Sequence, residues 1–130
     1  MSRIIIASGP VIVEGRKILV NKHGDTAFWK FCGGRVEDFD QTLWEAAKRE
    51  AKEEVGVDLE ILDPVPFVMH TSKHTDQGPV DAILVHFLAR RIGEAKPGPD
   101  IREIAWLDID ALPDDIGPNI LPALKHFKLL

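Results

Sequence analysis

The segment from Thr42 to Val57 constrains this chain most, because it predicts a helix with acidic residues on its apolar face. Thr42 and Glu45 form the T-x-x-E pattern of a capping box, in which the hydroxyl accepts a hydrogen bond from the first turn. Gly56 suits the C′ position, where a left-handed residue ends a helix. We therefore expect one helix between these two signals.

On a helical wheel, with a rotation of about 100° per residue, this helix has two distinct faces. Leu43 and the alanines fall on one face, and the lysines, with Arg49, fall on the opposite face. Glu50 and Glu54 project from the middle of the apolar face, with Glu53 at its margin. A Glu- and Lys-rich helix can simply be solvated, but here buried carboxylates that share one patch need a compensating cation. Oxygen ligands suit Mg²⁺ or Mn²⁺.

The residues before the helix add to this metal site. Residues 27–32 read as a short apolar strand that includes Phe28 and Trp29, and Gly33, Gly34 and Arg35 follow it. Paired glycines let the backbone turn sharply and approach a ligand closely. The Gly34 carbonyl would be a further hard oxygen ligand.

The remaining pattern predicts strands, one central helix, more strands and a terminal helix. We expect a mixed β-sheet covered by helices on its faces, which is an α+β fold. Residues 80–92 are the best candidate for a central strand, and Asn119 is a plausible N-cap of the last helix. The other expected strands cover residues 4–13, 17–22, 58–69 (interrupted by two prolines) and 103–107, and the last helix covers residues 119–129.

Together these segments resemble the Nudix box, whose pattern is G-x5-E-x7-R-E-U-x-E-E-x-G-U, where U is a bulky aliphatic residue. The second half matches from Arg49 to Val57, with Ala51 smaller than the pattern asks. The first half departs from it. Asp40 stands at the position of the first glutamate of the pattern. Eight residues instead of seven then separate Asp40 from Arg49. The loop is therefore one residue longer, and we expect Asp40 to support Arg49.

The resemblance implies the Nudix fold and a divalent-metal-dependent, MutT-like hydrolase that cleaves a pyrophosphate bond in a nucleoside diphosphate linked to another group. It implies Gly34, Glu50, Glu53 and Glu54 as ligands of Mg²⁺ or Mn²⁺. Arg49 joins the glutamates in the catalytic set, where it fixes the preceding loop through Asp40. The general base is either a box glutamate, with Glu50 our first choice, or a loop carboxylate outside the box.

The organic half of the substrate is less constrained. A nucleoside triphosphate is our first expectation, with a dinucleoside polyphosphate or a nucleotide sugar as alternatives, and a non-catalytic nucleotide-binding domain as a further one. Phe28 and Trp29 would stack on a base or pack in the core. Arg35 would reach a phosphate or lie on the surface. Asn119 would read a purine, as in some relatives, or cap its helix.

The composition of the chain limits its domain number, its partners and its cellular location. A chain of 130 residues with 45% hydrophobic content is most economically one domain over residues 1–130. A formal net charge of −5 argues against nucleic acid or a membrane as a partner. The start is too short for a signal peptide, and the single cysteine precludes an internal disulfide. We expect a cytoplasmic enzyme with a small-molecule nucleotide as its partner, and a homodimer is possible.

Overall fold

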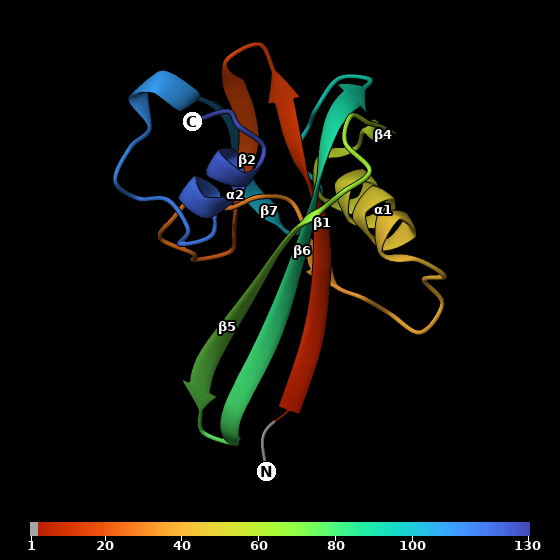
Figure 1. The fold of residues 1–130 in the computed structure, drawn as a ribbon, viewed down its shortest axis with the longest axis vertical. Helices are drawn as coiled ribbons and strands as arrows, with labels where there is room; N and C mark the ends of the chain where they lie inside the picture. Colours follow the sequence, from red (N-terminus) through yellow and green to blue (C-terminus); the bar gives the residue numbers. More distant parts are fainter. Residues whose placement is uncertain (1–2) are drawn as a thin grey trace.

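The computed structural model describes residues 3–130, in which a mixed sheet has one helix on each side (Figure 1). The seven strands run in the order β4-β6-β1-β2-β7, with β3 paired to β1 and β5 paired to β6. This arrangement confirms the expected α+β class. The elements are β1 (Arg3–Glu14), β2 (Lys17–His23), β3 (Gly34–Arg35), α1 (Leu43–Val55), β4 (Asp58–Ile61), β5 (Phe67–Thr75), β6 (Gly78–Ile92), β7 (Ile101–Asp108), the single turn η1 (Ile109–Ala111) and α2 (Ile120–His126).

The pairing of β1 with β6 forms the centre of the sheet. The two strands run parallel from Arg3 beside Val80 to Ile12 beside Ala89. The other edge of β6 pairs with both β5 and β4. Strand β6 is therefore enclosed on both edges, as expected for residues 80–92. Beyond Ile12, β1 turns to β2, which carries the sheet on to β7.

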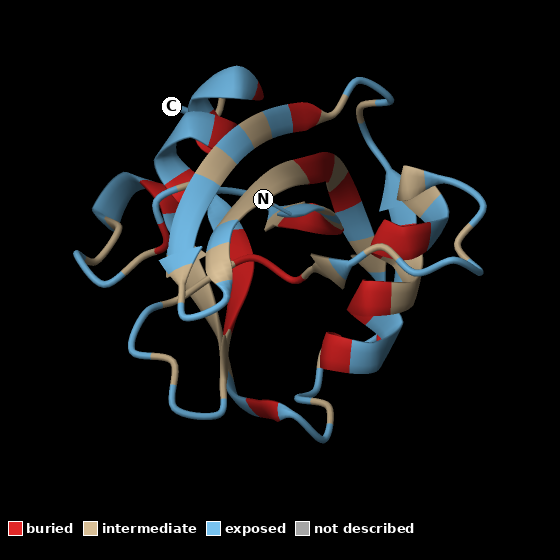
Figure 2. Cartoon of the chain, turned by 90° about the horizontal axis from the view of Figure 1, so that it is seen from below, coloured by how far each residue is buried: buried red, intermediate tan, exposed pale blue. Residues whose placement is uncertain are grey.

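The period of two along the strands divides the core into two layers. On β2, Ile18 and Val20 pack with α2, whereas Leu19 packs with α1. On β1, Val11 and Ile12 divide in the same way. Figure 2 shows buried positions on the strands and on the inward faces of both helices. Strands β1 and β2 thus each pack toward α1 with one face and toward α2 with the other.

Three expected elements differ from the structure. Residues 27–32 do not form a strand, because only isolated bridges join Trp29 to Ile116 and Lys30 to Asn21. The expected strand 58–69 is two strands, β4 and the start of β5, separated by the two prolines, which cannot donate to a ladder. The last helix covers Ile120–His126 instead of 119–129.

Two further expectations concern membrane-spanning helices and the bounds of the domain. Neither helix within residues 3–130 is long and apolar enough to cross a membrane. The single domain over residues 1–130 stays a prediction, and its first two residues lie outside the described part.

The anchoring of α2 gives a test of the second core layer. Leu124 is fully buried, whereas Leu121 on the same helix is 43% exposed. We expect Leu124→Ala to lower the free energy of unfolding by about 2–5 kcal/mol, because it leaves a cavity in the core. The control Leu121→Ala should cost about 1 kcal/mol or less. Equal losses in urea denaturation would contradict this account of how α2 is held.

Candidate functional site

Helix α1 begins and ends at the residues that the sequence predicted. The Thr42 hydroxyl accepts a hydrogen bond of 3.0 Å from the backbone N–H of Glu45. Gly56 adopts φ 72°, and its N–H donates to the Lys52 carbonyl. These caps fix which face of the helix meets the sheet.

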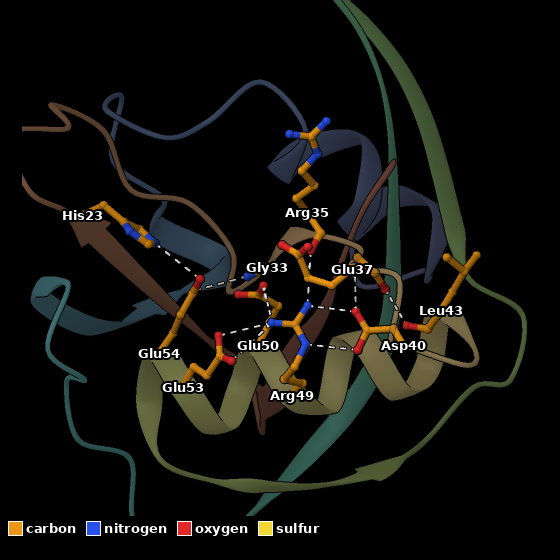
Figure 3. A network of polar contacts seen from close by, with 11 residues as sticks. His23, Gly33, Arg35, Glu37, Asp40, Leu43, Arg49, Glu50, Glu53 and Glu54 are labelled. Atoms are coloured by element: carbon orange, nitrogen blue, oxygen red, sulfur yellow. Dashed lines mark hydrogen bonds and ion pairs between the residues drawn. The ribbon is translucent and has the colours of Figure 1, made fainter. Parts of the chain in front are cut away.

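The inward face of α1 carries two buried carboxylates. Glu50 is 8% exposed and Glu54 is 6% exposed. Glu54 Oε1 accepts a hydrogen bond of 3.2 Å from the Gly33 backbone N–H (Figure 3). It accepts another of 3.2 Å from Asn21 Nδ2. Burial raises the pKa of Glu54 above its usual range; the Gly33 hydrogen bond partly offsets this, and the nearby Glu50 carboxylate adds to it. The pair is therefore costly without a cation.

The nearest histidine does not supply that positive charge. His23 Nε2 lies 3.4 Å from Glu54 Oε2. Burial lowers the pKa of His23, and the Lys30 charge lowers it further, so the ring is neutral at pH 7. The Glu54 carboxylate therefore gains no positive partner from His23 when it ionises, and the Lys30 charge offsets only part of the cost of burial.

Gly34 is packed directly against Glu50. A Cβ atom at residue 34 would lie 2.5 Å from Glu50 Oε1, so any side chain there would displace the Glu50 carboxylate. The glycine pair thus brings backbone groups onto both buried carboxylates, since Gly33 contacts Glu54. This is the close approach that the sequence led us to expect.

Glu53 does not join these two carboxylates. Its side chain is 57% exposed, and both of its oxygens lie 3.2 Å from Arg49 Nη1. The same Nη1 lies 3.1 Å from Glu50 Oε1. Within residues 3–130 no group of three or more His, Cys, Asp or Glu side chains is arranged to hold a metal ion. The structure therefore brings two of the expected carboxylates together and turns the third to Arg49.

Arg49 connects α1 to the long loop before it. Its Nε and Nη2 donate to the two oxygens of Asp40 at 3.0 and 2.9 Å. Nη2 also donates to the Arg35 carbonyl at 3.2 Å, and Asp40 accepts from the Glu37 backbone N–H at 2.8 Å. The hydrogen bond from Arg49 holds the pKa of Asp40 below its usual value. Asp40 thus makes the contact expected of it, despite its shorter side chain and the extra loop residue.

A cavity of about 470 Å³ lies beside the glycine pair. Phe28 and Asn119 line it, whereas Trp29 and Arg35 do not. Trp29 packs against the core on the α2 side, with Lys22 Nζ 4.4 Å from the centre of its ring. The lining residues are Ala7, Ser8, Phe28, Lys30, Phe31, Gly33, Gly34, Thr71, Ser72, Lys73, Leu84, His86, Pro118 and Asn119.

Asn119 differs from the expected N-cap. It precedes α2, but its side chain makes no capping hydrogen bond, and its Nδ2 lies 2.9 Å from His86 Nε2 instead. His86 was missed, because one histidine in an apolar strand resembles a core residue. Asn21 was also missed, although it shares the strand face of Leu19, which looks toward α1.

Comparison with known proteins identifies this arrangement. The family model of the NUDIX domain matches residues 4–127. The chain belongs to the Nudix family of hydrolases. Helix α1 and the loop before it carry the residues of its Nudix box, and the family match supports a pyrophosphohydrolase, as the sequence predicted. A comparison with curated protein sequences found no match.

Solved structures show the same fold. A MutT NUDIX hydrolase from Burkholderia pseudomallei is 24% identical with a TM-score of 0.76, and the match covers 95% of this chain and 97% of that one. A NUDIX hydrolase from Nitrosomonas europaea is 17% identical with a TM-score of 0.80, covering 97% and 89%. A bifunctional NMN adenylyltransferase/ADP ribose pyrophosphatase from Francisella tularensis, complexed with AMP and a manganese ion, is 18% identical with a TM-score of 0.69, covering 98% and 42%.

The contact between Asp40 and Arg49 gives a test of the Nudix loop. We expect Asp40→Ala to lower kcat on the order of a hundredfold, because a shift of about 1 Å in catalytic groups has that effect. Metal affinity should change little. Asp38→Ala is the control, since it removes the same charge from an exposed position in the same loop. Equal kcat values in the two variants would contradict a positioning role for Asp40.

Proposed function

We propose that this Nudix enzyme is a divalent-metal-dependent pyrophosphohydrolase whose substrate is a nucleoside triphosphate. The observation that carries the proposal is the pair of buried carboxylates, Glu50 and Glu54, beside a cavity of about 470 Å³. Gly33 and Gly34 line this cavity and also contact the two carboxylates. A group held at the glycine pair would therefore lie between the cavity and the acidic face of α1.

The donor set fits a hard divalent cation. Two desolvated carboxylates face each other without a charged histidine, and oxygen donors favour Mg²⁺ or Mn²⁺. Glu50 and Glu54 would hold the ion, with Glu53 and the Gly34 carbonyl as further oxygen ligands. When bound, the ion supplies charge neutralisation at the diphosphate oxygens and lowers the pKa of a coordinated water. The Francisella relative with AMP and manganese supports this choice of ion.

The remaining roles in catalysis fall to side chains of the protein. Glu50 is our first choice for the general base, with a loop carboxylate outside the helix as the alternative. Arg49 holds the loop through Asp40, so that the glycine pair stays against the carboxylates. Lys30 lines the cavity near the glycines, where its charge would attract a phosphate. Glu53 would leave Arg49 when it becomes a ligand.

The cavity favours a substrate with one nucleoside. Its volume lies within the usual range of about 300–1,000 Å³ for small-molecule sites, and Phe28 and Asn119 on its wall offer a stacking surface and a polar group. The ADP ribose pyrophosphatase relative keeps a nucleotide sugar as the second candidate, ahead of a dinucleoside polyphosphate. A cytoplasmic location and a possible homodimer stay predictions. The absence of nucleic-acid or membrane partners also stays a prediction, supported by the net charge of −5.

A panel of nucleotides separates these candidates. Release of phosphate and of pyrophosphate would be measured with Mg²⁺ on nucleoside triphosphates, ADP-ribose and dinucleoside tetraphosphates. We expect the highest kcat/KM on a nucleoside triphosphate. A higher value on ADP-ribose would move the assignment to nucleotide sugars, and no hydrolysis of any compound would favour a binding domain.

Neutralising one buried carboxylate should separate activity from stability. We expect Glu54→Gln to abolish hydrolysis, because a metal ligand is lost, and Glu53→Gln to do the same. In EDTA the melting temperature of Glu54→Gln should equal or exceed that of the wild type, because the desolvated charge beside Glu50 is removed.

Glu45→Gln is the matched control for this experiment. It makes the same substitution on the same helix at an exposed position, where Glu45 contacts only Lys48 among the described charged groups. It should keep its activity. Full activity in both Glu53→Gln and Glu54→Gln would overturn the assignment of the metal ligands.

A further inference from the structure

A buried histidine joins the central sheet to the wall of the cavity. His86 on β6 is 6% exposed, and its ring lies 5.1 Å from that of Phe31. Nδ1 lies 3.2 Å from the Gly9 carbonyl oxygen on β1, and Nε2 lies 2.9 Å from Asn119 Nδ2. Both ring nitrogens are therefore engaged, one by the sheet and one by a residue of the cavity.

The chemistry of these partners fixes where the proton lies. A carbonyl oxygen can only accept a hydrogen bond, so Nδ1 carries the hydrogen that Gly9 accepts. Burial lowers the pKa of His86 to about 4, so at neutral pH the ring has a single N–H. Nε2 is then bare and can only accept. The group that faces it must be the NH₂ of Asn119 and not its oxygen.

This bond takes Asn119 away from its helix. The side chain makes no capping bond to α2, and its Oδ1 accepts no hydrogen bond from the residues that the structure describes. An amide that can rotate by 180° presents either an acceptor or a donor at a given point. The bare Nε2 of His86 prevents that rotation, because the rotated amide would place two acceptors against each other.

We infer that His86 is a positioning residue that fixes the amide of Asn119, so that the cavity presents Oδ1 as an acceptor and selects nucleobases that offer an N–H there. This inference rests on the proposed function and deepens it. The Gly9 carbonyl orients His86, His86 orients Asn119, and Asn119 contacts the base. The parallel pairing of β1 with β6 places Gly9 beside His86, and the segment before α2 brings Asn119 to the other ring nitrogen.

The tautomer can be measured directly in the intact protein. Nitrogen-15 NMR of the histidine rings at pH 7, with the His86 signal assigned from its loss in His86→Phe, should show a protonated Nδ1 and a bare Nε2. A protonated Nε2 would overturn the inference. This result does not depend on catalysis, so it decides the positioning role even if the wild type hydrolyses no nucleotide, which would overturn only the proposed function.

Kinetics test the consequence for substrate selection. His86→Phe keeps the aromatic contact with Phe31 but removes the acceptor for Asn119. We expect KM for the best nucleotide to rise about tenfold, as for the loss of one hydrogen bond, with a smaller change in kcat. The ratio of kcat/KM between the best and worst bases of a triphosphate panel should narrow by a similar factor.

Two further variants test whether the change in base selectivity comes from the loss of the acceptor at residue 86. His86→Gln offers an oxygen that can accept from Asn119, and it should restore part of the base selectivity. His126→Phe makes the same change at an exposed histidine of α2 that contacts Phe67 and Phe127, and it should behave as the wild type. A folded His86→Phe with lowered kcat and unchanged base selectivity would assign His86 a structural role and overturn the inference.

Discussion

The site depends on the burial of two like charges, the carboxylates of Glu50 and Glu54, against a pair of glycines. Burial makes the ionised form of Glu54 unfavourable, and Glu50 beside it increases the penalty. A side chain at residue 34 would displace the Glu50 carboxylate, and the Gly33 N–H donates a hydrogen bond to Glu54. The chain therefore keeps, beside its cavity, a carboxylate whose ionised form is unfavourable and which a bound cation would stabilise.

Arg49 maintains this arrangement and offsets part of the charge on Glu50. Its guanidinium binds Asp40 with two nitrogens, and the third contacts both Glu50 and Glu53. The bidentate bond fixes the long loop on α1, and the loop leads back to the glycine pair through β3. The Glu53 side chain remains largely exposed beside Arg49, so it can rotate toward a bound metal ion at little cost in free energy. Arg49 thus links the conformation of the loop to the positions of the Glu50 and Glu53 carboxylates.

Local chemistry explains how much of this could be predicted from the sequence. The caps of α1 and its buried glutamates follow from short-range spacing, and the contact of Asp40 with Arg49 followed from the box pattern. Asn119 was assigned to the helix that it precedes, because its partner is 33 residues away on another element. That contact depends on how the segment before α2 lies against β6, which no local pattern specifies. Residues 27–32 were expected to form a strand because they are apolar, yet each bridge there joins a different neighbour.

The central claim is that Glu50 and Glu54 form a site for a divalent cation, and thermal melting with and without metal tests it most directly. Mg²⁺ or Mn²⁺ at millimolar concentration should raise the melting temperature of the wild type after EDTA treatment, because an ion that binds only the folded state stabilises it. A nucleotide should increase the shift, and Glu54→Gln should lose most of it. An unchanged melting temperature with both metal and nucleotide present would contradict the account.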